Sequence, residues 1–157
     1  MAFIYETENF IVEASDTPHI TRTDGGHIRI LPKKHFCDRT ELPPQLAIEL
    51  IRLTMVVGKA MKKALTVRGI KIMRINYVEA GNWAFKTGAK PFLHIHLYGR
   101  AKEAKRQPYK EAVYLPDRST GFYKNVEPLN KEDIKEIKKQ IKLVLKEKKY
   151  AENNWKL

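Results

Sequence analysis

A ten-residue stretch near the middle of the chain, PFLHIHLYGR at positions 91–100, constrains the fold more than any other segment. From Leu93 to Tyr98 its residues alternate between apolar and polar, a pattern typical of a half-buried β-strand. His94 and His96 therefore share one face of the predicted strand, about 6.6–6.8 Å apart along it. At this separation two imidazoles can act on one phosphate group or bind one ion.

The remaining pattern predicts an α+β domain with an antiparallel sheet. Short strands are expected at residues 4–5, 10–13, 27–32 and 70–78, and loop anchors or short strands at 113–115 and 122–123. Apolar residues recur every three or four positions from Pro44 to Gly69, which predicts one long helix covering the sheet, with Thr40 as its N-cap. A second apolar stripe predicts an amphipathic C-terminal helix over about 131–149.

Length and composition bound the domain organisation and the partners. The chain has 157 residues, enough for one domain, which we expect at 1–105, and a basic C-terminal extension at 106–157 packed on it. A net charge of +12 favours an anionic partner, although lysine- and glutamate-rich solvated faces would give the same excess. Cys37 is the only cysteine, so neither an intrachain disulfide nor a cysteine-based zinc site is expected. With no long apolar run, the sequence predicts a cytoplasmic protein that does not enter a membrane.

The segment before the histidines is an unusual loop, EAGNWAFKTGAKP at residues 79–91. It carries two aromatic residues, Trp83 and Phe85, and the two lysines Lys86 and Lys90. Loops that lead directly into a strand with chemically active side chains are common places for ligands. The alternative is that the two aromatic side chains only close an edge of the core.

The order of these segments resembles the histidine triad (HIT) family of nucleotide hydrolases and transferases. The resemblance covers about residues 3–100 and rests on GHIRILPKKH at 26–35, the long helix, a strand containing Asn76, and HIHLYGR at 94–100. The family motif is H-x-H-x-H followed by two apolar residues. Here Phe92 occupies its first position, so this chain has two of the three histidines.

The resemblance implies a HIT-like fold, a homodimer with joined sheets, and a set of roles. His94 takes the nucleophilic position of the motif, His96 its last position, and His27 the position beside the active site. Asn76 corresponds to a residue near the phosphate, and Ser15 or Asp16 falls where the family has an acidic ribose contact. Lys86, Lys90 and Arg100 complete the expected phosphate-binding set, because GAK at 88–90 replaces the polar residues that usually precede the histidines.

These roles imply hydrolysis or transfer at the α-phosphate of a nucleotide derivative. A neutral His94 would attack phosphorus to form a nucleotidyl-histidine, and a second, protonated imidazole would stabilise the developing charge. The resemblance implies no metal or other cofactor. Since the Phe92 ring makes no hydrogen bonds, a backbone carbonyl or another side chain must orient His94. The leaving group stays open: dinucleoside polyphosphates, phosphoramidates, and aminoacyl or sugar nucleotides all fit.

Three other interpretations remain at this stage. The first is a catalytically weak nucleotide-binding protein, or a HIT-like protein that binds or processes nucleic acid, since a chain of charge +12 could hold a polyanion. The second is a metal site on His94 and His96 with His27 or His35. The third is a structural role for the histidines, although paired imidazoles beside cations fill a core poorly.

Overall fold

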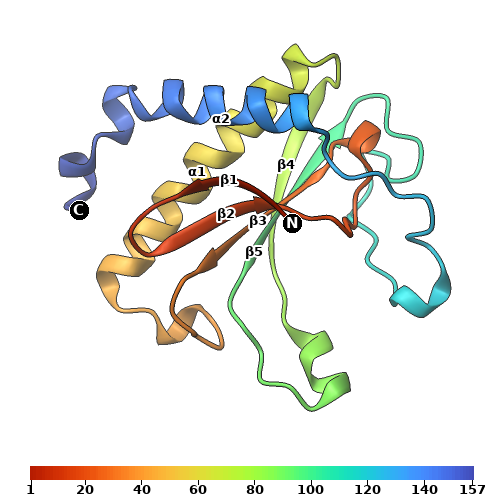
Figure 1. Cartoon of the computed structure of the whole chain (residues 1–157), viewed down its shortest axis with the longest axis horizontal. Coiled ribbons are helices and arrows are strands. Elements are labelled where there is room, and N and C mark those ends of the chain that lie inside the picture. Colours follow the sequence, from red (N-terminus) through yellow and green to blue (C-terminus); the bar gives the residue numbers. More distant parts are fainter.

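The computed structural model describes all 157 residues and contains one five-stranded antiparallel sheet (Figure 1). The strand order is β1-β2-β3-β5-β4. The strands are β1 (Ala2–Glu6), β2 (Phe10–Ala14), β3 (His27–Pro32), β4 (Ile72–Glu79) and β5 (Ile95–Ala101). The predicted α+β class is confirmed, and the order places β3, which carries His27, beside β5, which carries His96.

Helix α1 (Pro44–Val67) covers one face of the sheet (Figure 1). The helix begins at Pro44, so its N-cap position is Pro43 rather than Thr40. Proline suits the first helical position, because its missing N–H would have no partner there. Thr40 lies instead in the short 3-10 turn Arg39–Glu41, where its N–H donates to Asp38. The apolar stripe of α1 packs on the alternate strand residues that face it, including Ile30 and Leu97. Burial of these side chains forms the main core.

Helix α2 (Lys131–Leu145) crosses α1 and contacts β1 (Figure 1). Asn130 and Asp133 form a reciprocal capping box that starts the helix. The helix ends at Leu145, earlier than predicted, because no apolar residue continues its buried stripe before Tyr150. Tyr150 is held separately, since Arg52 donates to its carbonyl oxygen. No helix of the structure combines the length and the apolar character needed to cross a membrane.

Three other boundaries differ from the sequence prediction. Strand β5 begins at Ile95, so residues 91–94 approach it as an irregular segment, which the Leu93 N–H fixes by donating to the Phe36 carbonyl at 2.7 Å. Strand β4 begins at Ile72 rather than Ile70. The segments 113–115 and 122–123 form no strands, since their backbone groups bond mainly to side chains and to local turns.

Candidate active site

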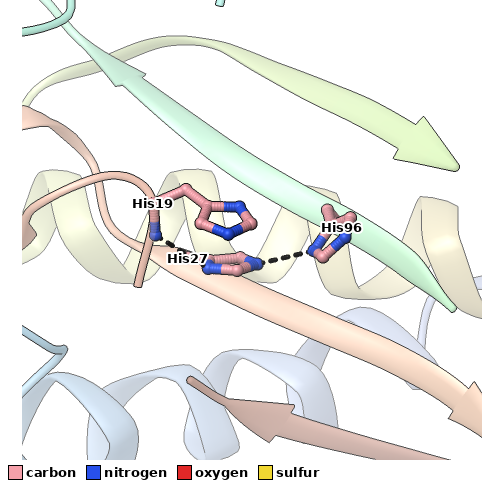
Figure 2. Close-up of side chains that lie close together, drawn as sticks. All are labelled: His19, His27 and His96. Carbon is pink, nitrogen blue, oxygen red and sulfur yellow. Dashed lines mark hydrogen bonds between the residues drawn. The ribbon is translucent and has the colours of Figure 1, made fainter. Parts of the chain in front are cut away.

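The face of the sheet opposite α1 carries the histidines. In the register of β3 and β5, His27 pairs with Tyr98 and Arg29 with His96, and residues that pair across antiparallel strands share a face. His27 and His96 are therefore diagonal neighbours, and His27 Nε2 lies 2.8 Å from His96 Nδ1 (Figure 2). The β-strand alternation read from the sequence thus places both imidazoles together.

A backbone group fixes the proton positions along this pair. The His19 N–H donates to His27 Nδ1 at 3.2 Å (Figure 2). A neutral His27 that accepts at Nδ1 carries its proton on Nε2 and donates it to His96 Nδ1. A neutral His96 that accepts at Nδ1 then carries its own proton on Nε2, which is the only ring N–H it can offer to a ligand.

Burial keeps this pair neutral. Desolvation lowers the pKa of His96 to about 3, with a smaller contribution from His94. Desolvation, followed by the charge of His96, holds the pKa of His27 well below its usual range. These shifts favour the neutral form of both rings, whereas a protonated second imidazole is expected from the sequence, and that role stays a prediction. A neutral His96 can donate a hydrogen bond to a ligand but adds no positive charge to the site.

His94 is oriented by the backbone of Phe92, two residues before it. Its Nδ1–H donates to the Phe92 carbonyl oxygen at 2.7 Å. Because a carbonyl only accepts, the neutral ring carries its proton on Nδ1 and leaves the Nε2 lone pair free. The ring lies edge-on to His96, with centroids 4.4 Å apart. The phenyl ring of Phe92 takes no part in this hydrogen bond, so its presence does not prevent the orientation of His94.

His94 and His96 line a cavity of about 700 Å³. Of the predicted phosphate contacts, Lys90 lines it as well. The structure adds side chains that the sequence did not single out for the site, namely Glu13, His19, Arg29, Leu115 and Arg118. Glu13 is the one carboxylate in the lining and is ion-paired with Arg29. The cavity therefore combines an imidazole with a free Nε2 lone pair, a second imidazole and an excess of positive charge.

Asn76 and Arg100 do not line this cavity. Arg100 is almost fully buried and donates to the Asn76 side-chain oxygen at 2.7 Å. Its other terminal nitrogen reaches three carbonyl oxygens, those of Gln107, Pro108 and Glu111, at 2.7–3.4 Å. Both predicted phosphate contacts are thus used to hold the chain that follows β5.

Three further predicted contacts also lie outside the cavity. Ser15 is buried and donates its backbone N–H to the His27 carbonyl. Asp16 is paired with the N-terminal amine. Lys86 is paired with Asp117, and this bond holds the pKa of the Asp117 carboxyl far below its usual range.

His19 is the main residue that sequence reasoning missed. Its ring stacks on His27 with centroids 4.9 Å apart, and its Nδ1 lies 2.7 Å from the Tyr98 hydroxyl. Burial, followed by the charge of Arg118, lowers its pKa to about 4. His19 lies in a loop, where no periodicity indicates a direction. Arg29 could have been predicted from the sequence. It lies two residues after His27 on a predicted strand, and residues two apart on a strand share a face.

The cluster that could hold a metal differs from the one considered from sequence. One ring nitrogen from each of His19, His27 and His96 lies within 4.8 Å of the others, whereas His35 is exposed beside Phe92. Two ligands of a tetrahedral zinc ion are about 3.3 Å apart. The His27–His96 hydrogen bond would therefore have to open before an ion could enter (Figure 2).

Comparisons with solved structures show that other proteins share this fold. Three solved structures share the fold: a hypothetical histidine triad nucleotide-binding protein from Sulfolobus tokodaii, a zinc-bound histidine triad family protein from Mycobacterium smegmatis, and a histidine triad protein from Bradyrhizobium japonicum. Their sequence identities are 22%, 22% and 16%, and their TM-scores are 0.58, 0.58 and 0.59. The matches cover 95%, 90% and 88% of this chain and 88%, 84% and 89% of those chains.

A comparison with curated proteins found none that matches this sequence. The profile of the HIT domain matches residues 2–103, which include β3, β5 and all the histidines. Because this match spans well over half of the chain, the protein belongs to the histidine triad family.

Proposed function

We propose that the protein is a nucleotide hydrolase or nucleotidyltransferase that acts at an α-phosphate through a nucleotidyl intermediate on His94. The observation that carries this proposal is the hydrogen bond from His94 Nδ1 to the Phe92 carbonyl, which leaves Nε2 free beside the cavity. Membership of the HIT family and the basic lining of the cavity support it.

In the first step, His94 Nε2 attacks the α-phosphorus, and the bond from phosphorus to the leaving group breaks. The leaving group departs with the electron pair. The resulting imidazolium keeps its Nδ1 proton, and the Phe92 carbonyl oxygen stabilises that positive charge. The His96 Nε2–H donates to a phosphoryl oxygen, while Lys90, which also lines the cavity, offsets its negative charge.

In the second step, a water or another acceptor hydroxyl attacks phosphorus from the side opposite His94. The Nε2–P bond breaks, its electron pair returns to the imidazole, and the proton of the attacking oxygen passes to solvent. Water gives a nucleoside monophosphate, whereas an acceptor gives a transfer product. His27 is a positioning residue here, because it fixes the tautomer of His96.

The test is release of nucleoside monophosphate from adenine and guanine nucleotides with different groups on the α-phosphate, followed by mass spectrometry. Wild-type protein and a His35→Ala variant, which lacks an exposed histidine outside the cavity, should release the same product. A His94→Ala variant should release none. Intact-protein mass spectrometry at neutral pH should detect a nucleotidyl adduct on wild type only. Equal release by His94→Ala would refute the mechanism.

A second candidate function is polyanion binding, supported by a separate groove of about 790 Å³ between β1 and α2. Six lysines of α2 and the residue after it line this groove without a carboxylate: Lys131, Lys135, Lys138, Lys139, Lys142 and Lys146. Several phosphates bound there would make the affinity for single-stranded RNA or DNA fall steeply with salt, whereas a mononucleotide site gives a shallow dependence. Titrations at two salt concentrations distinguish the two.

We also propose that two copies associate through β4. This strand is one edge of the sheet, and its backbone groups on the outer side have no strand partner. The exposed Met73 and Tyr77 add apolar surface along it. Light scattering after size exclusion should give twice the mass of one chain, and Met73→Lys should lower it. A wild-type protein that stays monomeric at high concentration would refute this proposal.

A further inference from the structure

The segment after β5 is held against the HIT domain by buried polar groups. The carboxylate of Asp24, which is 2% exposed, accepts the backbone N–H groups of Lys105, Arg106 and Gln107 at 2.8–2.9 Å. Arg100, at the C-terminal end of β5, donates to the carbonyls of Gln107, Pro108 and Glu111 in the same segment. These bonds to the HIT domain therefore fix the path of the segment after β5 (Figure 1).

The next part of the segment is clamped by its own side chains. Buried Gln107 exchanges two hydrogen bonds with the backbone of Tyr114, at 2.7 and 2.9 Å. The Tyr123 hydroxyl donates to the Pro116 carbonyl at 2.9 Å, and Arg106 donates to the carbonyls of Phe122 and Lys124. Residues 114–124 thus form a braced loop, which we call the wall loop.

The wall loop brings Arg118 to the cavity that His94 lines. Its guanidinium donates to the Thr17 carbonyl at 2.8 Å and lies over the rings of Tyr123 and Trp83, at 5.0 and 6.0 Å. One nitrogen is thus fixed, while the side chain stays exposed and can offer its remaining N–H groups to a ligand.

The charge of Arg118 has no carboxylate partner. The acid next to it, Asp117, is paired with Lys86, and the one carboxylate in the cavity lining, Glu13, is paired with Arg29. With Lys90, Arg118 therefore gives the cavity positive charge that nothing in the protein neutralises. An anionic group of the ligand is its natural counterpart.

The position of Arg118 identifies which part of the ligand it meets. Both rings that it covers, Trp83 and Tyr123, lie against His19, with centroids 5.7 and 5.3 Å from that ring. His19 in turn lies 5.4 Å from His96. Two rings, His19 and either Trp83 or Tyr123, therefore lie between Arg118 and His96, although all three of Arg118, His94 and His96 line the same cavity. Arg118 thus faces a part of the ligand other than the phosphorus that His94 attacks.

We propose that Arg118 is a specificity-determining residue that binds a phosphate of the leaving group. The inference rests on the function proposed above and narrows its substrate class. Substrates whose leaving group carries a phosphate, such as dinucleoside polyphosphates or sugar nucleotides, are favoured over those that release a neutral amine. The wall loop supplies this contact from outside the residues that match the HIT domain.

The test compares two substrates that share adenosine monophosphate but differ in leaving group. Cleavage of diadenosine tetraphosphate at the α-phosphate releases a leaving group that carries anionic phosphates. Cleavage of adenosine 5′-phosphoramidate releases an amine. Arg118→Ala should lower kcat/KM about 10- to 100-fold for the first substrate, as expected for one charge-assisted hydrogen bond, and less than about threefold for the second. Arg118→Lys should restore a large part of the loss.

The matched control is Lys124→Ala, which removes a positive charge from the exposed end of the wall loop, outside the cavity, and should change neither value. If Arg118→Ala lowers kcat/KM equally for both substrates, the role of Arg118 is merely structural and the proposal is overturned. If it lowers kcat/KM for neither substrate, the proposal is overturned as well. If wild type cleaves neither substrate, the proposed function has failed separately. Competition binding of ATP against AMP then decides: a preference for ATP that Arg118→Ala removes supports the phosphate site, and an unchanged preference overturns it.

Discussion

The two faces of the sheet are made by the same strands but are stabilised and used in opposite ways. On the face toward α1, Ile30 and Leu97 are fully buried among apolar side chains, and their burial needs no particular direction. On the other face, His27, His96 and Tyr98 are also buried, yet their ring nitrogens and hydroxyl must each be placed. The first face tolerates any well-packed apolar set, whereas the second depends on a directed chain of hydrogen bonds.

The largest effect should come from the nucleophile on the polar face. His94→Ala should lower the rate of nucleoside monophosphate release on the order of a thousandfold or more, because no other group replaces the attacking nitrogen. Since His94 is only half-buried and its one hydrogen bond is to a carbonyl, the free energy of unfolding should change by less than about 1 kcal/mol. Steady-state kinetics and urea unfolding on the same preparation separate these two effects.

A residue of the apolar face three positions further along the chain should behave in the opposite way. Leu97→Ala should lower the free energy of unfolding by about 2–5 kcal/mol, since it removes a fully buried side chain and leaves a cavity. At a temperature where the variant is folded, its kcat should stay close to wild type. If Leu97→Ala instead lost activity without losing stability, the separation between the two faces would be refuted.

The connection between the HIT domain and the wall loop offers a third comparison. Asp24→Asn should lower the free energy of unfolding by about 1–3 kcal/mol. An amide has only one acceptor oxygen, whereas three backbone N–H groups now donate to the two oxygens of the carboxylate. Hydrogen exchange should then rise first in residues 105–107. A matched Asp38→Asn variant, which changes an exposed carboxylate in the turn before α1, should alter stability far less.

The sequence predicted the faces of the sheet better than their connections. Alternation placed His94 and His96 correctly, and the position of His27 on a strand opened by glycines brought it beside them. Arg100 and Asn76 lie on the site face of their strands, but periodicity cannot reveal that the two bind each other and the segment after β5. His19 and Arg118 come from loops, whose path is set by distant partners such as Thr17 and Asp24.

Acid should destabilise the protein through the buried histidines of the polar face, at pH values where most carboxylates are still ionised. The unfolded chain binds a proton at each histidine below about pH 6.5, whereas burial lowers the pKa of His19 to about 4 and that of His96 to about 3 in the folded state. Between these values the unfolded state binds more protons, so the free energy of unfolding falls as the pH falls. Each such histidine contributes about 1.4 kcal/mol per pH unit.

A His19→Gln variant offers the check on this dependence. Urea unfolding at pH 7, 6, 5 and 4.5 should give a shallower slope for the variant than for wild type, by about 1.4 kcal/mol per pH unit. Identical slopes would mean that His19 has the same pKa in the folded and unfolded states, so that folding does not hold its ring neutral. The neutral chain of rings would then be broken at its first member.

The smallest expected effect tests whether the last hydroxyl of the polar face has the directed role assigned to it. Tyr98 is fully buried, and its hydroxyl lies 2.7 Å from His19 Nδ1. Tyr98→Phe keeps the ring, its packing against His27 and its stacking on His96. It removes only the hydroxyl that His19 contacts, which should lower the free energy of unfolding by about 1 kcal/mol. A double-mutant cycle with His19→Gln should show a coupling of similar size, because the two residues share the bond. Additive effects would show instead that Tyr98 acts by packing alone, so that this residue would belong with the apolar face in the way it stabilises the fold.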